Sequence, residues 1–325
     1  MKAVIPAAGM GKRFHPWTLQ NAKELLPVID PQTKKISGVI DIVVREAREA
    51  GCTDVLVITA LGKSSLKEHL TKQQIGGYIP EDVRLHYTDQ HAPKGLGDAV
   101  LCAKNFVGAE DFAVLLGDDF YSSNPVKDLL GAYEEIKSDP KFGAILTVQK
   151  LPRQILSRYG VVKVKNEGKI MQVEDMVEKP ETPPSDFAIT GRYILSNKIF
   201  AHICDVAPDK KGEIQITDAM KKMISNGYNV YCIEMKGKRY DAGDPASWLN
   251  TITEVGLGGN GQNNKNSPLV PISALKCGVL RHSLKWRVFE LWSALQEKNL
   301  RIFLCQEKSS LFSLEVRGFK PCAPQ

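Results

Sequence analysis

The sequence lacks any uninterrupted run of about 18 apolar residues, the length that a membrane-spanning helix requires. Its first residues, MKAVIPA, read as the start of a strand and carry neither the basic region nor the apolar core of a secretory signal. The seven cysteines are scattered without a CxxC pair, which predicts reduced thiols rather than a zinc site or a disulfide framework. We therefore expect a cytoplasmic protein with no membrane partner.

Two common nucleotide-binding signatures are also missing. The glycine-rich stretch GMGKRF, residues 9–14, lacks the third glycine of GxGxxG and the spacing of a Walker A loop. These absences disfavour a dinucleotide-dependent oxidoreductase and a P-loop NTPase. The sequence also offers no clear His and Cys pair for nucleophilic catalysis.

Positive charge is concentrated at one end of the chain. The formal net charge is +6, and residues 260–325 alone hold ten Lys and Arg against four Glu and no Asp. The remaining 33 basic and 33 acidic residues cancel. A neutral body gives no electrostatic ground for a nucleic-acid partner. The charge of the tail is interpreted as a solvated face, with nucleic-acid binding as the weaker alternative.

Apolar, β-rich runs alternate with amphipathic stretches over about the first 140 residues. Apolar residues spaced by three and four in IDIVVREAREAG predict a helix that stops at Gly51, and VLVIT follows as a strand. From about residue 143 the sequence becomes strand-rich, with helices expected near 196–206 and 215–226. The pattern predicts an α/β fold with a Rossmann-like, mixed but mainly parallel sheet flanked by helices.

This pattern ends at GLGGNGQNNKNSP, which is rich in glycine and asparagine and has no apolar periodicity. We expect one domain over residues 1–256 and a linker over 257–268. A basic C-terminal extension of unknown role would follow over 269–325, with one amphipathic helix before a strand.

The loop AAGMGKR after the first expected strand combines small, flexible backbone with positive charge. Without a Cβ, Gly9 and Gly11 let backbone N–H groups approach a phosphate, and Lys12 and Arg13 add charge. A tight turn with solvated cations explains the same residues. Lys23, in NAKELLPV, either meets these phosphates from a second loop or lies at the surface. Ligands of such sheets bind beyond the carboxyl ends of the strands, so the phosphate site is expected there.

The stretch YTDQHAPKGLGDAVLCA is a candidate for binding a nucleobase. The Gln90 amide both donates and accepts, which suits the edge of a base. Gly95 and Gly97, at the start of a helix, leave the backbone bare for a base or a ribose.

Carboxylates mark two further strand ends. In LLGDDFY, Asp118 and Asp119 are adjacent and should point to opposite sides, so they do not chelate one ion together. One of them would instead join Asp241 of KRYDAGDP and phosphate oxygens in a Mg²⁺ site. In VEKP, Glu178 suits sugar hydroxyls and Lys179 suits a phosphate, although a polar strand end explains this pair as well.

The order AVIPAAGMGKR, KELLPV, QHAPKGLGDAVLCA, LLGDD, YGVV, VEKP, FAITGRYIL, KGEIQITDA and DAGDP resembles the sugar-1-phosphate nucleotidylyltransferases. It is most similar to their bacterial-type UTP:glucose-1-phosphate uridylyltransferase branch, from residue 1 to about 255. The resemblance implies Mg²⁺-dependent transfer of a uridylyl group from UTP to glucose 1-phosphate, by in-line attack on the α-phosphorus, giving UDP-glucose and pyrophosphate. It also implies a homo-oligomer, either a dimer or a tetramer.

The resemblance also implies roles for individual residues. The nucleotide would be held by Ala7, Ala8, Gly9, Gly11, Arg13, Gln90 and Gly95. The sugar phosphate would be held by Gly160, Glu178, Lys179 and Gly191. Mg²⁺ would be held by Asp118 and Asp241. The catalytic set would be Arg13, Lys23, Asp118 and Lys179, in which Lys23 would neutralise charge at the reacting phosphates.

This chain departs from the family pattern in several places. Lys12 stands where the family usually has Thr, and Asp98 replaces a frequent His. The stretch DPQTKKISGV, residues 30–39, is longer and more polar than usual, and the tail beyond residue 256 matches nothing in the family. Three alternatives stay open: thymidylyl transfer to glucose 1-phosphate, uridylyl transfer to another sugar 1-phosphate, and a non-catalytic regulatory subunit that binds nucleotide sugar.

Overall fold

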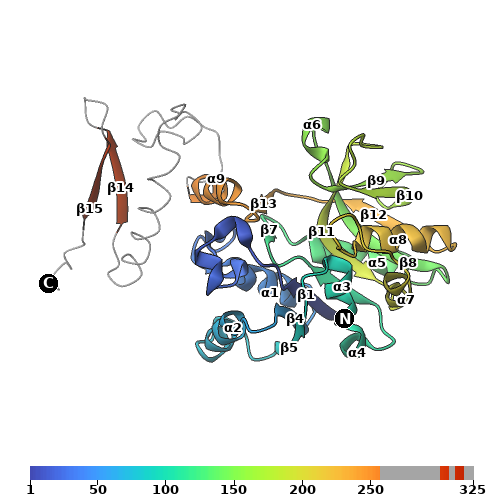
Figure 1. Ribbon diagram of the computed structural model, residues 1–325, viewed down its shortest axis with the longest axis horizontal. Helices are drawn as coiled ribbons and strands as arrows, with labels where there is room; N and C mark the ends of the chain where they lie inside the picture. Colours follow the sequence, from blue (N-terminus) through green and yellow to red (C-terminus); the bar gives the residue numbers. More distant parts are fainter. Residues whose placement is uncertain (257–300, 307–311, 318–325) are drawn as a thin grey trace. The chain divides into compact units, whose positions relative to one another are not determined.

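The computed structural model describes residues 1–256, 301–306 and 312–317. The chain divides into two compact units, Met1–Gly256 and Leu257–Gln325 (Figure 1). In the second unit, β14 (Arg301–Gln306) and β15 (Phe312–Arg317) pair as an antiparallel hairpin. The linker expected over 257–268 and the helix expected in the extension lie outside the described residues.

The first unit is built on a nine-stranded sheet with the order β5-β4-β1-β6-β11-β8-β12-β10-β9. Its strands are β1 (Lys2–Ala7), β4 (Asp54–Ala60), β5 (Arg84–Gln90), β6 (Phe112–Leu115), β8 (Phe142–Lys150), β9 (Gly160–Val164), β10 (Met171–Glu178), β11 (Phe187–Leu195) and β12 (Asn229–Glu234). Two small ribbons accompany it, β2 (Pro27–Ile29) with β3 (Ile36–Gly38), and β7 (Asp119–Tyr121) with β13 (Arg239–Asp241).

The sheet is mixed, as the sequence predicts, but its two halves differ. The four strands β5, β4, β1 and β6 are parallel, which confirms the alternation of strands and helices in the first 140 residues. Beyond them only β8 and β12 pair in parallel, and the other pairings of the described sheet are antiparallel. The sheet is therefore more evenly mixed than expected, because β11 lies antiparallel between β6 and β8, and β10 and β9 add antiparallel pairings at the far edge.

The helices cover both faces of the sheet (Figure 1). They are α1 (Val39–Glu49), α2 (Ser65–Ile75), α3 (Leu96–Leu101), α4 (Lys104–Val107), α5 (Pro125–Ile136), α6 (Arg153–Leu156), α7 (Ile199–Cys204), α8 (Ile216–Ser225) and α9 (Pro245–Gly256), with 3₁₀ turns at Lys12–Phe14, Trp17–Leu19 and Lys23–Leu25. The helices expected near 196–206 and 215–226 are α7 and α8. Helix α1 ends at Glu49, just before Gly51, whose φ is 87°, as its spacing predicts.

Alternation along β1 explains the two cores. Successive strand residues point to opposite faces, so Val4 packs with α3, α7 and α8, whereas Ala3 and Ile5 pack with α1 and α2. Ala3, Val4 and Ile5 are all fully buried. Burial of β1 on both faces is typical of a strand in the middle of a parallel sheet. The loops that follow the carboxyl ends of these strands are where a ligand is expected to bind. Among the described helices none has the length and apolar character needed to traverse a bilayer.

Candidate active site

The glycine-rich loop and Gln90 lie at the same edge of the sheet. Ala7 ends β1 beside Thr59 of β4, and Ala60 of β4 lies beside Gln90, the last residue of β5. The expected nucleotide residues therefore span three neighbouring parallel strands. Lys12 and Arg13 sit in the first 3₁₀ turn of the loop and are exposed.

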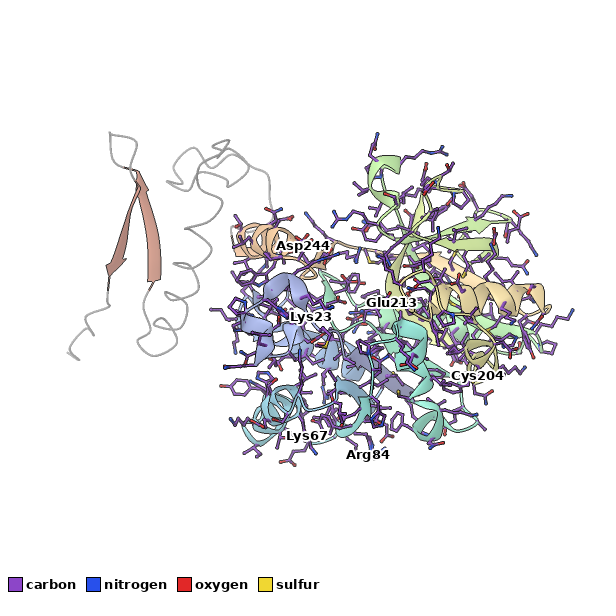
Figure 2. The ribbon with its side chains drawn as sticks, in the orientation of Figure 1. Lys23, Lys67, Arg84, Cys204, Glu213 and Asp244 are labelled. Atoms are coloured by element: carbon purple, nitrogen blue, oxygen red, sulfur yellow. The ribbon has the colours of Figure 1, made fainter. Side chains whose placement is uncertain are left out.

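Lys23 connects this loop to the carboxylates after β6. Its side chain passes Gly9 so closely that a Cβ there would lie 3.2 Å from Cε of Lys23. Its Nζ then donates a hydrogen bond of 2.5 Å to Oδ2 of Asp118. Lys23 therefore lies directly against the glycine-rich loop. Figure 2 shows Lys23 toward the middle of the first unit, in contrast to Lys67 and Arg84 near its rim.

The pair of Lys23 and Asp118 is charged. Burial lowers the pKa of Lys23, but the carboxylates of Asp118 and Glu24 outweigh burial and hold it above its usual range. Burial raises the pKa of Asp118, and Lys23 with Arg239 outweighs this and lowers it. The side chains are only 19% and 30% exposed. Lys23 is therefore a largely buried ammonium paired with Asp118, and not an exposed surface lysine.

Glu24 lies behind Lys23 and is almost fully buried, at 1% exposed. Its Oε1 is 3.9 Å from Nζ of Lys23, and its Oε2 has no hydrogen-bond partner. Burial raises the pKa of Glu24 from 4.5 to about 7, with Lys23 acting in the opposite direction. Glu24 therefore titrates near neutral pH in the folded protein.

We expect Glu24→Gln to change how stability depends on pH. The folded state holds the Glu24 proton more tightly than the unfolded chain, so this contribution is fully present below pH 4.5 and is lost as the pH rises through about 7. Relative to the native protein, the variant should gain about 3 kcal/mol of unfolding free energy between pH 4.5 and 8. Urea denaturation across this range measures it. Parallel pH profiles would contradict the assignment, and Glu68→Gln, on the exposed face of α2, is the matched control.

Asp118 and Asp119 diverge, as their adjacency predicts. Asp118 meets Lys23, whereas Asp119 is 3% exposed and accepts two hydrogen bonds from Nη2 of Arg239, at 2.9 and 2.8 Å. Burial raises the pKa of Asp119 to about 6 although Arg239 opposes it. Arg239 also stacks over the Tyr159 ring, with Cζ 5.1 Å from the centroid. The sequence analysis missed Arg239, which sits two residues before Asp241 on β13.

Asp118 and Asp241 face a common space. Ala242 N–H donates to the Asp118 carbonyl at 3.2 Å, which brings the two segments together. A Cβ on Gly243 would lie 2.9 Å from Oδ1 of Asp241 and 3.9 Å from Oδ2 of Asp118. Carboxylate oxygens suit Mg²⁺. The described residues contain no cluster of three or more His, Cys, Asp or Glu that could hold a metal by themselves. Oδ2 of Asp118 accepts from Lys23 at 2.5 Å and Oδ1 of Asp241 accepts from the Gly243 N–H at 2.6 Å. An ion held by these two carboxylates would take its other ligands from phosphate and water.

A cavity of about 280 Å³ opens beside Asp119. It brings together all four residues expected to hold the sugar phosphate, namely Gly160, Glu178, Lys179 and Gly191. The rest of its lining is Leu96, Leu116, Asp119, Arg158, Tyr159, Ile189, Tyr193, Glu213, Gln215, Ile216, Thr217 and Arg239. Figure 2 marks Glu213 close to the middle of the unit. Polar and charged groups on several sides suit a small, hydroxyl-rich anion.

Glu178 is the central acceptor of this cavity. Thr217 Oγ1 donates to its Oε2 at 2.9 Å, and Lys179 Nζ donates to its Oε1 at 2.6 Å. Gly160 lies against it, since a Cβ there would be 3.1 Å from Oε2. Lys179 has a φ of 46°, a left-handed conformation that is uncommon outside glycine. Thr217 belongs to the motif GEIQITDA, but the motif gives no indication that its hydroxyl contacts Glu178.

Gly191 and Arg192 support the wall between the cavity and the Asp118 loop. Gly191 has a φ of 76°, and a Cβ there would lie 2.8 Å from Cδ1 of Leu116, so only glycine fits. The five N–H groups of Arg192 are all used. They donate to both carboxylate oxygens of Glu46 on α1 and to the backbone carbonyls of Leu116, Gly191 and Asp119. The sequence analysis did not identify this buried pair.

Close packing of a neighbouring segment requires glycine at two positions after Gln90. A Cβ on Gly95 or Gly97 would lie 2.7 or 2.8 Å from atoms of Ile214. Gly97 N–H also donates to the Ile214 carbonyl at 2.8 Å. The missing side chains therefore make room for the segment that carries Ile214. The part of Gly95 and Gln90 in binding the nucleotide stays a prediction.

Comparison with known proteins agrees with this arrangement. The family model described as Nucleotidyl transferase matches residues 2–256. The UTP–glucose-1-phosphate uridylyltransferase of Bacillus subtilis strain 168 is 36% identical over 283 residues, covering 79% of this chain and 91% of that protein. A putative uridylyltransferase of this kind from Methanocaldococcus jannaschii is 38% identical over 275 residues, covering 78% and 93%. A solved UDP-glucose pyrophosphorylase complexed with UDP-glucose has a TM-score of 0.69 and 33% identity, covering 78% of this chain and 97% of that one.

Proposed function

The chain belongs to the nucleotidyl transferase family, and we propose that it transfers the uridylyl group of UTP to glucose 1-phosphate. The products are UDP-glucose and pyrophosphate. Relatives that are named as UTP–glucose-1-phosphate uridylyltransferases align with most of the chain. The similar solved structures include one complexed with UDP-glucose and one described as UTP-bound.

One observation carries the proposal. Asp118 and Asp119 are adjacent, yet Asp118 faces Lys23 and the glycine-rich loop, whereas Asp119 lines the cavity of Glu178 and Lys179. The candidate phosphate site at Lys23 and the polar cavity around Glu178 therefore adjoin each other at Asp118 and Asp119. A nucleoside triphosphate on the loop and a sugar phosphate in the cavity would bring their phosphates together there.

The chemistry needs charge neutralisation and alignment more than proton transfer. A phosphate monoester is largely ionised at pH 7, because its second pKa is near 6, so the attacking oxygen requires no general base. Its in-line attack on the α-phosphorus forms one P–O bond and breaks the bond to the pyrophosphate. Lys23 and Arg13 would meet charge on the triphosphate, and Lys179 would meet the sugar phosphate.

Asp118 and Asp241 would hold Mg²⁺, which supplies positive charge at the phosphates when bound. Arg239 keeps Asp119 paired within the cavity wall, so that this carboxylate does not repel the incoming anion. Glu178, held by Thr217, would accept hydrogen bonds from the glucose hydroxyls. Assembly into a dimer or tetramer and a cytoplasmic location remain predictions.

Steady-state release of pyrophosphate tests the proposal. We expect the highest kcat/KM with UTP and glucose 1-phosphate, and lower values when dTTP or N-acetylglucosamine 1-phosphate replaces either substrate. A preference for dTTP or for the N-acetyl sugar would assign one of the two alternative transferases. Nucleotide binding without release from any pair would assign a regulatory subunit instead.

A further inference from the structure

The Gln90 amide is held in one orientation by two acceptors. Its Nε2 donates to Oδ2 of Asp98 at 2.6 Å and to the Gly95 carbonyl at 3.2 Å. A carboxylate and a carbonyl only accept hydrogen bonds, so the NH₂ end of the amide must face both. The carbonyl end, Oε1, must then face the other way.

Oε1 of Gln90 is left open on that other side. Within the part of the chain that the structure describes, no group donates a hydrogen bond to this oxygen, and it is absent from the fully buried polar atoms without partners. The side chain itself is 5% exposed. Gln90 therefore presents a single, nearly buried acceptor at the carboxyl end of β5, two strands away from β1, which carries the glycine-rich loop.

From this geometry we infer that Asp98 sets the base specificity of the site by fixing the Gln90 amide. The inference rests on the proposed function, in which the base of UTP lies at this edge. A fixed acceptor matches the N3–H of uracil and opposes the unprotonated N3 of cytosine, which is itself an acceptor. Asp98 is thus a positioning residue that selects UTP over CTP through Gln90. Its place on α3, one turn from Gly95, is where the family pattern has a histidine.

Replacing Asp98 with Asn should weaken this selection. The Asn amide offers either a donor or an acceptor, so the Gln90 amide can turn and present its NH₂ group to cytosine. Titration calorimetry with UTP and with CTP, in the presence of Mg²⁺, gives the specificity ratio, which is the Kd of CTP divided by the Kd of UTP. We expect this ratio to fall roughly tenfold in Asp98→Asn, mainly because CTP binds more tightly.

The control is Asp128→Asn. Asp128 occupies the first turn of α5 and pairs with Lys236 at 3.7 Å, so its loss removes the same kind of helix-start carboxylate away from Gln90. The ratio in this variant should equal that of the native protein. Should Asp98→Asn fail to fold, Asp98→Ser removes the fixed acceptor in the same way.

Three results would overturn the inference. The first is a ratio within twofold of native in the Asp98 variant, and the second is a native protein that does not prefer UTP over CTP. The third is a variant that changes only the ratio of the Kd values for UTP and dUTP, because Asp98 would then act on the ribose. Binding is measured without glucose 1-phosphate. A protein that prefers UTP but makes no UDP-glucose would therefore refute the proposed function and leave this inference standing.

Discussion

Asp118→Asn should lower kcat/KM for UTP and glucose 1-phosphate about a hundred- to a thousandfold. Asp118 orients the Lys23 ammonium at 2.5 Å, and in the proposed function it would also hold Mg²⁺ together with Asp241. Asparagine keeps the shape but loses the charge that both functions need. The fold should persist, because asparagine has the size of aspartate and the side chain at this position is 30% exposed. Initial rates of pyrophosphate release and a far-UV CD melt measure the two effects.

Asp82→Asn is the matched control for this loss of charge. Asp82 accepts a hydrogen bond from Arg48 at 2.9 Å at the surface, where both side chains are well exposed. Its replacement should leave the rate unchanged and cost at most about 1 kcal/mol of stability. A native rate in Asp118→Asn would remove this residue from the reaction and refute its place in the metal site.

Arg192→Met should destabilise the protein by about 3–5 kcal/mol. The substitution leaves the Glu46 carboxylate, 5% exposed, without its partner, and frees the carbonyls of Leu116, Gly191 and Asp119. Because Leu116 and Asp119 flank Asp118, the rate should fall as well. Urea denaturation gives the change in unfolding free energy.

The double variant Glu46→Leu, Arg192→Met separates the cost of an unpaired charge from the value of the pair. Removing both charges takes away the unpaired carboxylate, so the double variant should be more stable than Arg192→Met alone. An equal or larger loss in the double variant would show that the pair itself contributes most of the stability. Arg192→Lys should not restore the native value, since an ammonium has three donors for five acceptors.

The parallel half of the fold and its site edge could be predicted from the sequence. Short-range patterns, such as the apolar spacing that ends before Gly51 and the strand VLVIT, determine α1 and β4 almost alone. The rule that ligands bind beyond the carboxyl ends of parallel strands then places the glycine-rich loop at the edge of the site. The divergence of Asp118 and Asp119 likewise follows from their adjacency.

Long-range packing could not be predicted in the same way. Arg192 and Glu46 are separated by more than 140 residues in the chain. No local sequence pattern predicts that a charged residue of a strand will be buried against a helix. Gly95 and Gly97 suggest an open backbone for a ligand, yet Ile214, from a distant loop, fills that space. The same applies to Thr217, whose hydroxyl reaches Glu178 only because α8 packs on β10.

Transfer of label from UTP tests the central claim most directly. The protein is incubated with glucose 1-phosphate, Mg²⁺ and UTP that carries ³²P at the α-phosphorus, and the products are separated by anion exchange. Attack on the α-phosphorus predicts that the label appears in UDP-glucose in step with release of unlabelled pyrophosphate. Label that appears in UMP or UDP, or that stays in UTP, would contradict the account.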